Sequence, residues 1–189
     1  MNKVFAVATI VLGLSLILVA PVYAVQRRLP TSAPTPTPTP TPTVVPVNSF
    51  ELFWPLVAGK TEGDSFYSLK LIKEQVQGWF IFDGSKKADY QVFLGTKRVL
   101  ESEKLIKESK AKNAEKTLER ASSNFSRAYD FAKTAGDKGN FDAGKVRKDR
   151  LFNVKTLIDS LKVFAPSDLN IGLDVVRGKA DRLLSDYLP

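Results

Sequence analysis

Residues 63–103 decide the fold of this chain, and they read GDSFYSLKLIKEQVQGWFIFDGSKKADYQVFLGTKRVLESE. Apolar side chains recur in the first half of this stretch at spacings of three and four, the period of one face of an α-helix. These side chains are Phe66, Leu69, Ile72, Val76 and Trp79. We therefore predict a helix over residues 64–79, capped by Asp64 or Ser65, whose apolar face is covered by the helices that follow.

A turn divides the stretch at Asp83-Gly84-Ser85, where the residue types favour a tight turn and can cap a new helix. From there a second helix is predicted over residues 85–109. Its apolar positions are Ala88, Tyr90, Phe93, Leu94, Leu100 and Leu105.

Three more helices are predicted over residues 114–135, 141–164 and 168–187, the last two separated by Pro166. The first has an unbroken a/d pattern made of Ala114, Leu118, Ala121, Phe125, Ala128, Ala132 and Ala135. The inward side chains of the other two are Leu151, Val154, Ile158, Leu161 and Phe164, then Leu169, Leu173, Val176, Ala180, Leu183 and Tyr187. The predicted fold class is therefore all-α, a bundle of four to five helices.

The alanines of residues 114–135 require a partner helix that approaches closely. Only a short turn at residues 110–113 separates this helix from the one over 85–109, so we expect an antiparallel hairpin. The alanine seam packs either within the chain or against a second copy.

The N-terminal residues 1–24 are typical of a signal peptide. Residues 4–19 carry no charge, and Val22 and Ala24 stand at the −3 and −1 positions of a signal-peptidase site. The alternative is a retained membrane anchor, because the apolar run to Val25 is long enough to span a bilayer. Both alternatives place the rest of the chain outside the cytoplasm, secreted or membrane-anchored.

Residues 25–47 form a linker rich in Pro and Thr, with the repeat TPTPTPTPT at its centre. Alternating proline removes backbone donors and favours a disordered, extended spacer rather than helix or strand. At about 3.1 Å per residue, its proline-rich part reaches on the order of 50 Å. The sequence thus predicts a helical domain over residues 48–189, held away from a surface.

The composition excludes several kinds of chemistry. The chain of 189 residues contains no Cys and no His, which rules out disulfides, Cys or His zinc sites and Ser-His or Cys-His catalysis. Its net charge is +8, which in the cytoplasm would suggest nucleic acid. Because we expect export and find no reading motif, we predict no nucleic-acid partner. An anionic cell-surface polymer or anionic lipid suits this charge better, unless the charge serves only solubility. We expect neither a cofactor nor a metal.

Charged side chains of the two helices in residues 63–103 lie at spacings that place them on shared faces. We expect them to form structural polar contacts where the helices cross, with Glu74 or Asp83 accepting from Arg98. The residues concerned are Tyr67, Lys70, Glu74, Asp83, Arg98 and Glu101.

The segment over residues 47–61 has a high apolar content. We expect it to lie extended across the bundle as a lid that buries Phe53 and Trp54, and alternatively to offer Phe50, Phe53 and Trp54 to a partner. Gly59-Lys60-Thr61 resembles the end of a phosphate-binding loop, but Trp54 stands where that motif needs its first Gly.

Residues 50–165 also resemble a bacterial family, an uncharacterised domain of exported or single-span proteins. The matching positions are Gly63, Tyr67, Leu69, Lys70, Glu74, Phe82, Asp83, Lys87, Ala88, Arg98 and Glu101. Some members look like the extracytoplasmic regions of anti-sigma-factor-like proteins. The resemblance implies an all-α domain of unknown function outside the membrane, without an assigned activity. We expect no direct anti-sigma role, because the sequence shows no separate sigma-binding domain.

We interpret the chain as an exported, non-enzymatic interaction or structural module of the cell envelope. Its partner would be an envelope protein or an anionic surface polymer, with membrane contact through residues 1–24 if they are not cleaved. One alternative is the sensory domain of a membrane-anchored regulator. Another is a cell-wall glycosidase, which needs only two carboxylates, taken from Glu74, Asp83, Glu101 and Glu103. Calcium at Asp137, Asn140 and Asp142 is rejected, because the closing Glu of an EF-hand loop is absent.

Overall fold

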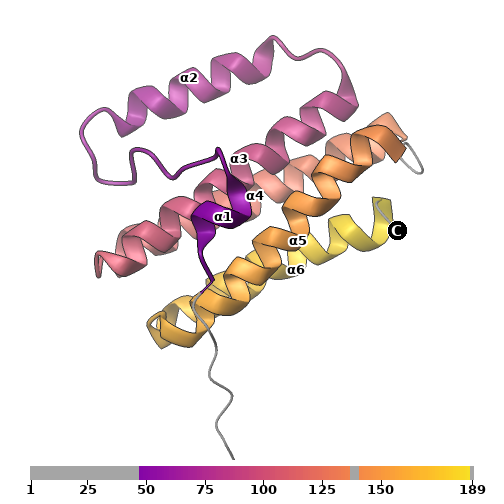
Figure 1. The fold of residues 1–189 in the computed structure, drawn as a ribbon. Helices are drawn as coiled ribbons and strands as arrows, with labels where there is room; N and C mark the ends of the chain where they lie inside the picture. The colour runs from indigo at the N-terminus through magenta and orange to yellow at the C-terminus, as the bar shows by residue number, and fades with distance from the viewer. Residues whose placement is uncertain (1–46, 137–140, 188–189) are drawn as a thin grey trace, which may run out of the picture. The chain divides into compact units, whose positions relative to one another are not determined.

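The computed structural model describes residues 47–136 and 141–187, and within them the chain forms α-helices and no strand, as Figure 1 shows. The predicted all-α bundle is therefore confirmed. The predicted signal peptide or anchor, the linker up to residue 46 and the turn at residues 137–140 lie outside the described residues. No helix in the described part of the chain has the length and apolar character needed to cross a membrane.

Helices α3 (Gly84–Lys107) and α4 (Ala111–Ala135) form the predicted antiparallel hairpin, and their packing is the most extensive between any two described helices. The alanine seam of α4 is buried from Ala114 to Ala132, whereas Ala135 is exposed at the end of the helix. Gly95 of α3 lies against the ring of Phe125, so closely that a Cβ atom there would stand 2.8 Å from the ring. Small residues thus let the backbones of the hairpin approach, as the alanine pattern indicates.

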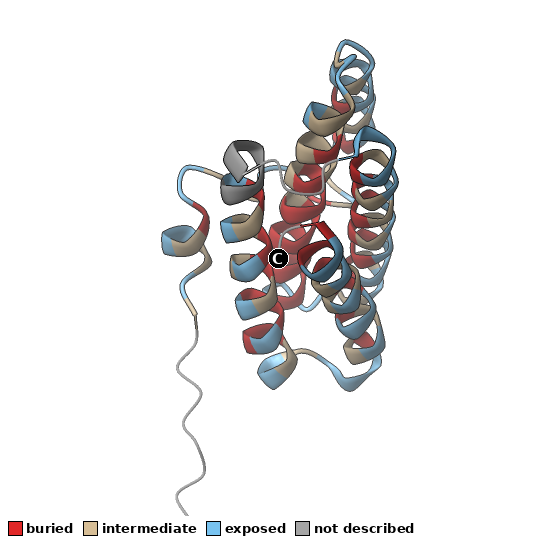
Figure 2. Cartoon of the chain, turned by 90° about the vertical axis from the view of Figure 1, so that its right-hand side faces the viewer, coloured by how far each residue is buried: buried red, intermediate tan, exposed pale blue. Residues whose placement is uncertain are grey.

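Helices α5 (Phe141–Phe164) and α6 (Asn170–Tyr187) complete the core, with a 3₁₀ turn at Ser167–Leu169 between them. Helix α6 packs against both α4 and α5. Figure 2 shows the buried segments on the facing sides of the long helices. All the predicted inward side chains of these two helices are buried except Phe164, which is 46% exposed. Phe164 is the last residue of α5, where the chain leaves the helix.

The segment before α2 contains a short helix, α1 (Ser49–Phe53), where an extended chain was expected. Asn48 caps this helix, because its side chain accepts a hydrogen bond of 3.1 Å from the amide of Phe50. Phe53 is buried, but Trp54 is 68% exposed and meets Phe50 edge to face. The prediction that Trp54 is buried was therefore wrong, since one short turn of helix places only one of the two rings against the bundle.

Helix α2 (Tyr67–Trp79) begins three residues later than predicted. Asp64 does not cap it, because its carboxylate accepts from the amide and hydroxyl of Thr61 at 2.6 and 3.0 Å and so closes the preceding turn. Phe66 takes the position before the helix with a φ of 67°, in the left-handed region.

The predicted inward face of α2 points to solvent, and this is the largest departure from expectation. Its five side chains, which we name the α2 apolar face, are between 37% and 69% exposed; they are Phe66, Leu69, Ile72, Val76 and Trp79. The buried side chains of this helix are Tyr67 and Glu74. The reason lies in α3, which presents charged groups to α2. Burying them against an apolar face would leave their charges unpaired, at a high cost.

Candidate functional site

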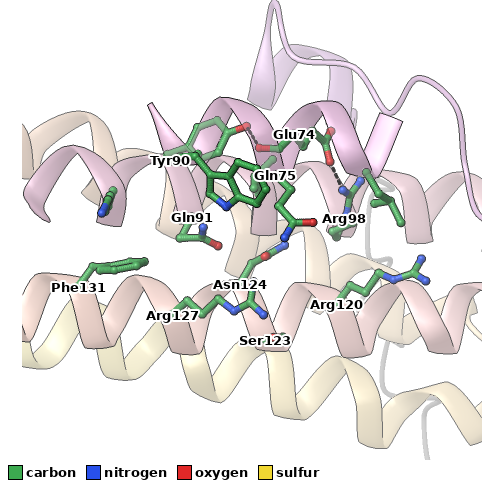
Figure 3. Close-up of a pocket in the computed structure, with 15 residues that line it drawn as sticks. Glu74, Gln75, Tyr90, Gln91, Arg98, Arg120, Ser123, Asn124, Arg127 and Phe131 are labelled. Carbon is green, nitrogen blue, oxygen red and sulfur yellow. Dashed lines mark hydrogen bonds and ion pairs between the residues drawn. The ribbon is translucent and has the colours of Figure 1, made fainter. Parts of the chain in front are cut away.

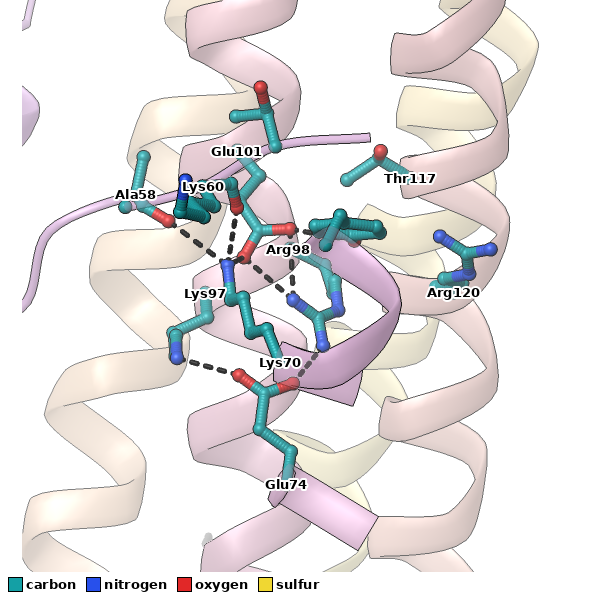
Figure 4. A network of polar contacts seen from close by, with 12 residues as sticks. Ala58, Lys60, Lys70, Glu74, Lys97, Arg98, Glu101, Thr117 and Arg120 are labelled. Atoms are coloured by element: carbon teal, nitrogen blue, oxygen red, sulfur yellow. Dashed lines mark hydrogen bonds and ion pairs between the residues drawn. The ribbon is translucent and has the colours of Figure 1, made fainter. Parts of the chain in front are cut away.

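A cluster of polar side chains joins α2 to α3, and Figure 4 shows it from close by. In α2 the spacing of three and four residues brings Tyr67, Lys70 and Glu74 to one face, and α3 meets that face with a similar row. The α2–α3 polar cluster consists of Tyr67, Lys70, Glu74, Lys97, Arg98 and Glu101.

Glu101 is the centre of this cluster and is fully buried. Its carboxylate accepts from the hydroxyl of Tyr67 at 3.0 Å and from the ammonium of Lys70 at 2.5 Å. One nitrogen of Arg98 donates to both of its oxygens, at 2.6 and 2.9 Å. A buried carboxylate is tolerated only when its charge is compensated in this way.

Glu74 is the second buried carboxylate, and it accepts from the other arm of Arg98 and from Lys97, the latter at 2.7 Å. Lys70 also donates to the carbonyl oxygens of Lys60 and Ala58, at 2.5 and 3.3 Å. The cluster therefore fixes the position of α2 on α3 and also holds the loop that precedes α2.

The surroundings of these groups shift their ionisation. Burial, the negative charge of Glu101 and the hydrogen bond to it raise the pKa of Tyr67 to about 12. Burial lowers the pKa of Lys70, although Glu101 acts in the opposite direction. Burial also opposes the charge on Arg98, but Glu101 and Glu74 outweigh it and raise the pKa of Arg98.

Asp83, the remaining predicted polar contact, lies outside the cluster. Its carboxylate accepts from the amide of Lys86 at 2.8 Å and caps α3. Sequence reasoning missed Lys97, and it missed an ion pair between Arg120 of α4 and Glu62. The guanidinium of Arg120 also lies over the ring of Tyr67, 5.5 Å from its centre. Lys97 could have been found, because it lies four residues before Glu101 and so on the same side of α3. The pair of Glu62 and Arg120 is too distant in sequence to be recognised.

A cavity of about 760 Å³ lies beside the cluster, between α2, α3 and α4 (Figure 3). Its charged lining consists of Lys87, Arg98, Arg120 and Arg127 against the single carboxylate of Glu74. Further polar lining comes from Gln75, Gln91, Ser123 and Asn124, and aromatic lining from Trp79, Tyr90 and Phe131. Tyr90 closes one part of the wall, because its hydroxyl donates to the carbonyl oxygen of Glu74 at 2.8 Å.

Comparison with protein families gives one result. Residues 59–149 match the family model described as Domain of unknown function (DUF5667). Over these residues the chain is similar to that domain. No curated protein and no solved structure matches the chain. The match confirms the resemblance to a domain of unknown function, while its bacterial and anti-sigma-like setting stays a prediction.

The DUF5667 match covers α2, α3 and α4, and so includes the polar cluster, the α2 apolar face and the cavity. Two of the carboxylates considered for glycosidase chemistry, Glu74 and Glu101, are bound by Lys and Arg side chains, and Glu103 pairs with Lys107 at 2.6 Å. Within the described residues, no three acidic side chains gather as metal ligands. The carboxylates of Glu74, Glu101 and Glu103 are therefore engaged in ion pairs with neighbouring cations.

Proposed function

We propose that the chain is an exported, non-enzymatic interaction module of the cell envelope, and that it docks on the outer leaflet of a membrane through the α2 apolar face. One observation carries this proposal: α2 is held by its polar side, which leaves five large apolar side chains in solvent. Two more aromatic residues, Phe80 and Phe82, extend this surface beyond the helix, at 73% and 87% exposed. A row of exposed, large apolar side chains along one helix face is typical of an interaction site.

A lipid surface suits this helix for two reasons. Helices that lie in the membrane interface carry Trp, Phe and Leu on one face and Lys or Arg near the boundary. Lys73 is exposed on α2, and the ammonium of Lys60 lies 5.8 Å from the centre of the Phe66 ring. The net charge of +8 adds an attraction to anionic headgroups.

The sequence before the domain supports the same choice. If the apolar run up to Val25 is retained as an anchor, the Pro-Thr linker keeps the domain within tens of ångströms of the leaflet. Tethering converts docking into an intramolecular event, so that even weak burial of α2 becomes effective.

A sensory domain of an anchored regulator is the second candidate, and the cavity beside α2 is the observation that favours it. A ligand there would contact the same helix that docks on the membrane. Glycosidase activity is not proposed, because the carboxylates of Glu74 and Glu101 are both engaged in ion pairs with Lys and Arg side chains.

The test reconstitutes the full chain in vesicles of phosphatidylcholine and phosphatidylglycerol whose acyl chains carry bromine, which quenches nearby indoles. The chain has two tryptophans, so Trp54→Phe leaves Trp79 of α2 as the reporter. We expect Trp79 to be quenched, and Leu69→Asp with Ile72→Asp to remove the quenching. The matched control is Ile171→Asp with Val175→Asp, which changes two exposed apolar residues of α6 and should leave the quenching unchanged.

Absence of quenching would refute docking on lipid. Concentration-dependent cross-linking between copies, lost in the variant with Leu69→Asp and Ile72→Asp, would show that a second copy covers α2 instead.

A further inference from the structure

The geometry points to a second binding site in the cavity between α2, α3 and α4, and we propose that it takes a saccharide bearing a carboxylate or phosphate group. This site goes beyond the docking proposed above, because it uses Glu74 and Gln75 of α2 together with residues of α3 and α4, and of the α2 apolar face it includes only Trp79, the last residue of the helix. Its volume of about 760 Å³ falls within the range of roughly 300–1,000 Å³ that is typical of small-molecule pockets.

The charge of the lining favours an anion. Glu74 is occupied by Arg98 and Lys97, so it does not neutralise the other cations. Arg127 makes no ion pair and no hydrogen bond within the described part of the chain, and it is exposed toward the cavity. The ammonium of Lys87 lies 5.6 Å from the centre of the Phe131 ring. A carboxylate or phosphate bound between such groups would gain charge-assisted hydrogen bonds.

The uncharged polar lining favours a ligand with hydroxyl groups. Asn124 is only 9% exposed, yet its side chain makes no hydrogen bond with any described residue. The side-chain oxygen of Gln91 is likewise buried without a partner. Figure 3 shows Gln75 of α2 and Asn124 of α4 pointing toward one another across the cavity. A buried acceptor such as the Gln91 oxygen is rarely left unpaired, and the amides of Gln75 and Asn124 line the same cavity, so together they offer donors and acceptors for a bound molecule.

The aromatic lining completes the match to a saccharide. Trp79 and Tyr90 stand on the α2 and α3 sides, and Phe131 on the α4 side. Flat rings suit the C–H faces of a pyranose, while the guanidinium of Arg127 and the amides suit its acidic and hydroxyl groups. The two sources of such a ligand are a uronic-acid glycan and a sugar phosphate.

The test uses the full chain in nanodiscs of unbrominated lipid, where isothermal titration calorimetry follows binding independently of the Trp79 signal used for docking. The probes are trigalacturonic acid, glucose 1-phosphate, neutral maltotriose and inorganic phosphate alone. We expect one of the two acidic sugars to bind, and whichever binds identifies the source. Arg127→Ala should weaken that binding about tenfold or more, since it removes a charged hydrogen-bond donor. Asn124→Ala should weaken it less.

The matched control is Lys116→Ala, which removes the same charge from an exposed position of α4 outside the cavity and should leave the affinity unchanged. Equal binding of maltotriose, equal binding of inorganic phosphate, no binding of either acidic sugar, or binding unaffected by Arg127→Ala would each overturn the proposal. Leu69→Asp with Ile72→Asp should retain sugar binding, so that failure of the docking proposal and failure of this site are distinguishable.

Discussion

Replacing Arg98 by Met should lower the stability of the domain more than any other single change in the polar cluster. Arg98 is 3% exposed and donates three hydrogen bonds, two to Glu101 and one to Glu74. Met has a similar length and no charge, so Arg98→Met removes these bonds while filling much of the space. Both carboxylates then remain buried with less compensation.

The magnitude follows from the contacts that survive. Three charged hydrogen bonds at roughly 1.5–3 kcal/mol each would sum to more than is measured when a buried ion pair is broken, about 3–5 kcal/mol. Because Lys70 still holds Glu101 and Lys97 still holds Glu74, we expect the lower end, about 3 kcal/mol. For a domain of this size, that corresponds to a melting temperature lower by about 10 °C.

Urea unfolding followed by far-ultraviolet circular dichroism measures this loss. The control is Arg177→Met, because Arg177 on α6 also contacts two carboxylates, Asp159 and Asp181, but at the surface. It should cost less than about 1 kcal/mol. In a chain that already carries Glu101→Gln, Arg98→Met should cost about 1–2 kcal/mol less than in the natural chain, since the buried charge is gone. A cost below about 1 kcal/mol for Arg98→Met, or strictly additive effects, would refute the account of the cluster.

Three further predictions concern other parts of the domain. In the folded state the pKa of Tyr67 is about 12, above the usual value of 10.0. The neutral phenol therefore stabilises the fold below pH 10, and this contribution should be lost as the pH rises from 10 through 12. The difference in unfolding free energy between the natural chain and Tyr67→Phe should change across this window and stay constant below it. Gly95→Ala should destabilise by roughly 1–3 kcal/mol because of Phe125, whereas Gly178→Ala in α6, with open space around it, should stabilise by up to about 1 kcal/mol, both in urea unfolding. Amides of residues 67–79 should exchange with deuterium before those of α4, because α2 buries few apolar side chains; equal protection would contradict this.

The helices of the core could be predicted from sequence because their apolar side chains repeat at helical spacing and most of these side chains are buried, with Ala135 and Phe164 at helix ends as exceptions. The seam from Ala114 to Ala132 is the clearest case, since four of its six positions are alanines, which favour a helix and require a close neighbour. The same reasoning failed for α2. A helical period identifies the helix, but it does not say whether the apolar face is inside.

What decided the orientation of α2 lies outside α2. Arg98 and Glu101 are on α3, and their burial requires partners that only the polar side of α2 supplies. The spacing of Tyr67, Lys70 and Glu74 predicts the residues that α2 contributes to this contact. The spacing of Arg98 and Glu101 predicts those that α3 contributes. Neither pattern shows which face of α2 turns toward α3. That depends on whether leaving the charges of α3 unpaired costs more free energy than leaving the apolar face of α2 in solvent.

This balance links the stability of the domain to its proposed function. An apolar α3 surface would let α2 bury its apolar face, and it would stabilise the bundle at least as well, because buried ion pairs rarely improve on good apolar packing. It would also remove the exposed surface. Stability alone therefore does not explain the buried cluster centred on Glu101. The cluster does hold α2 with its apolar face outward, and the proposed docking requires that orientation.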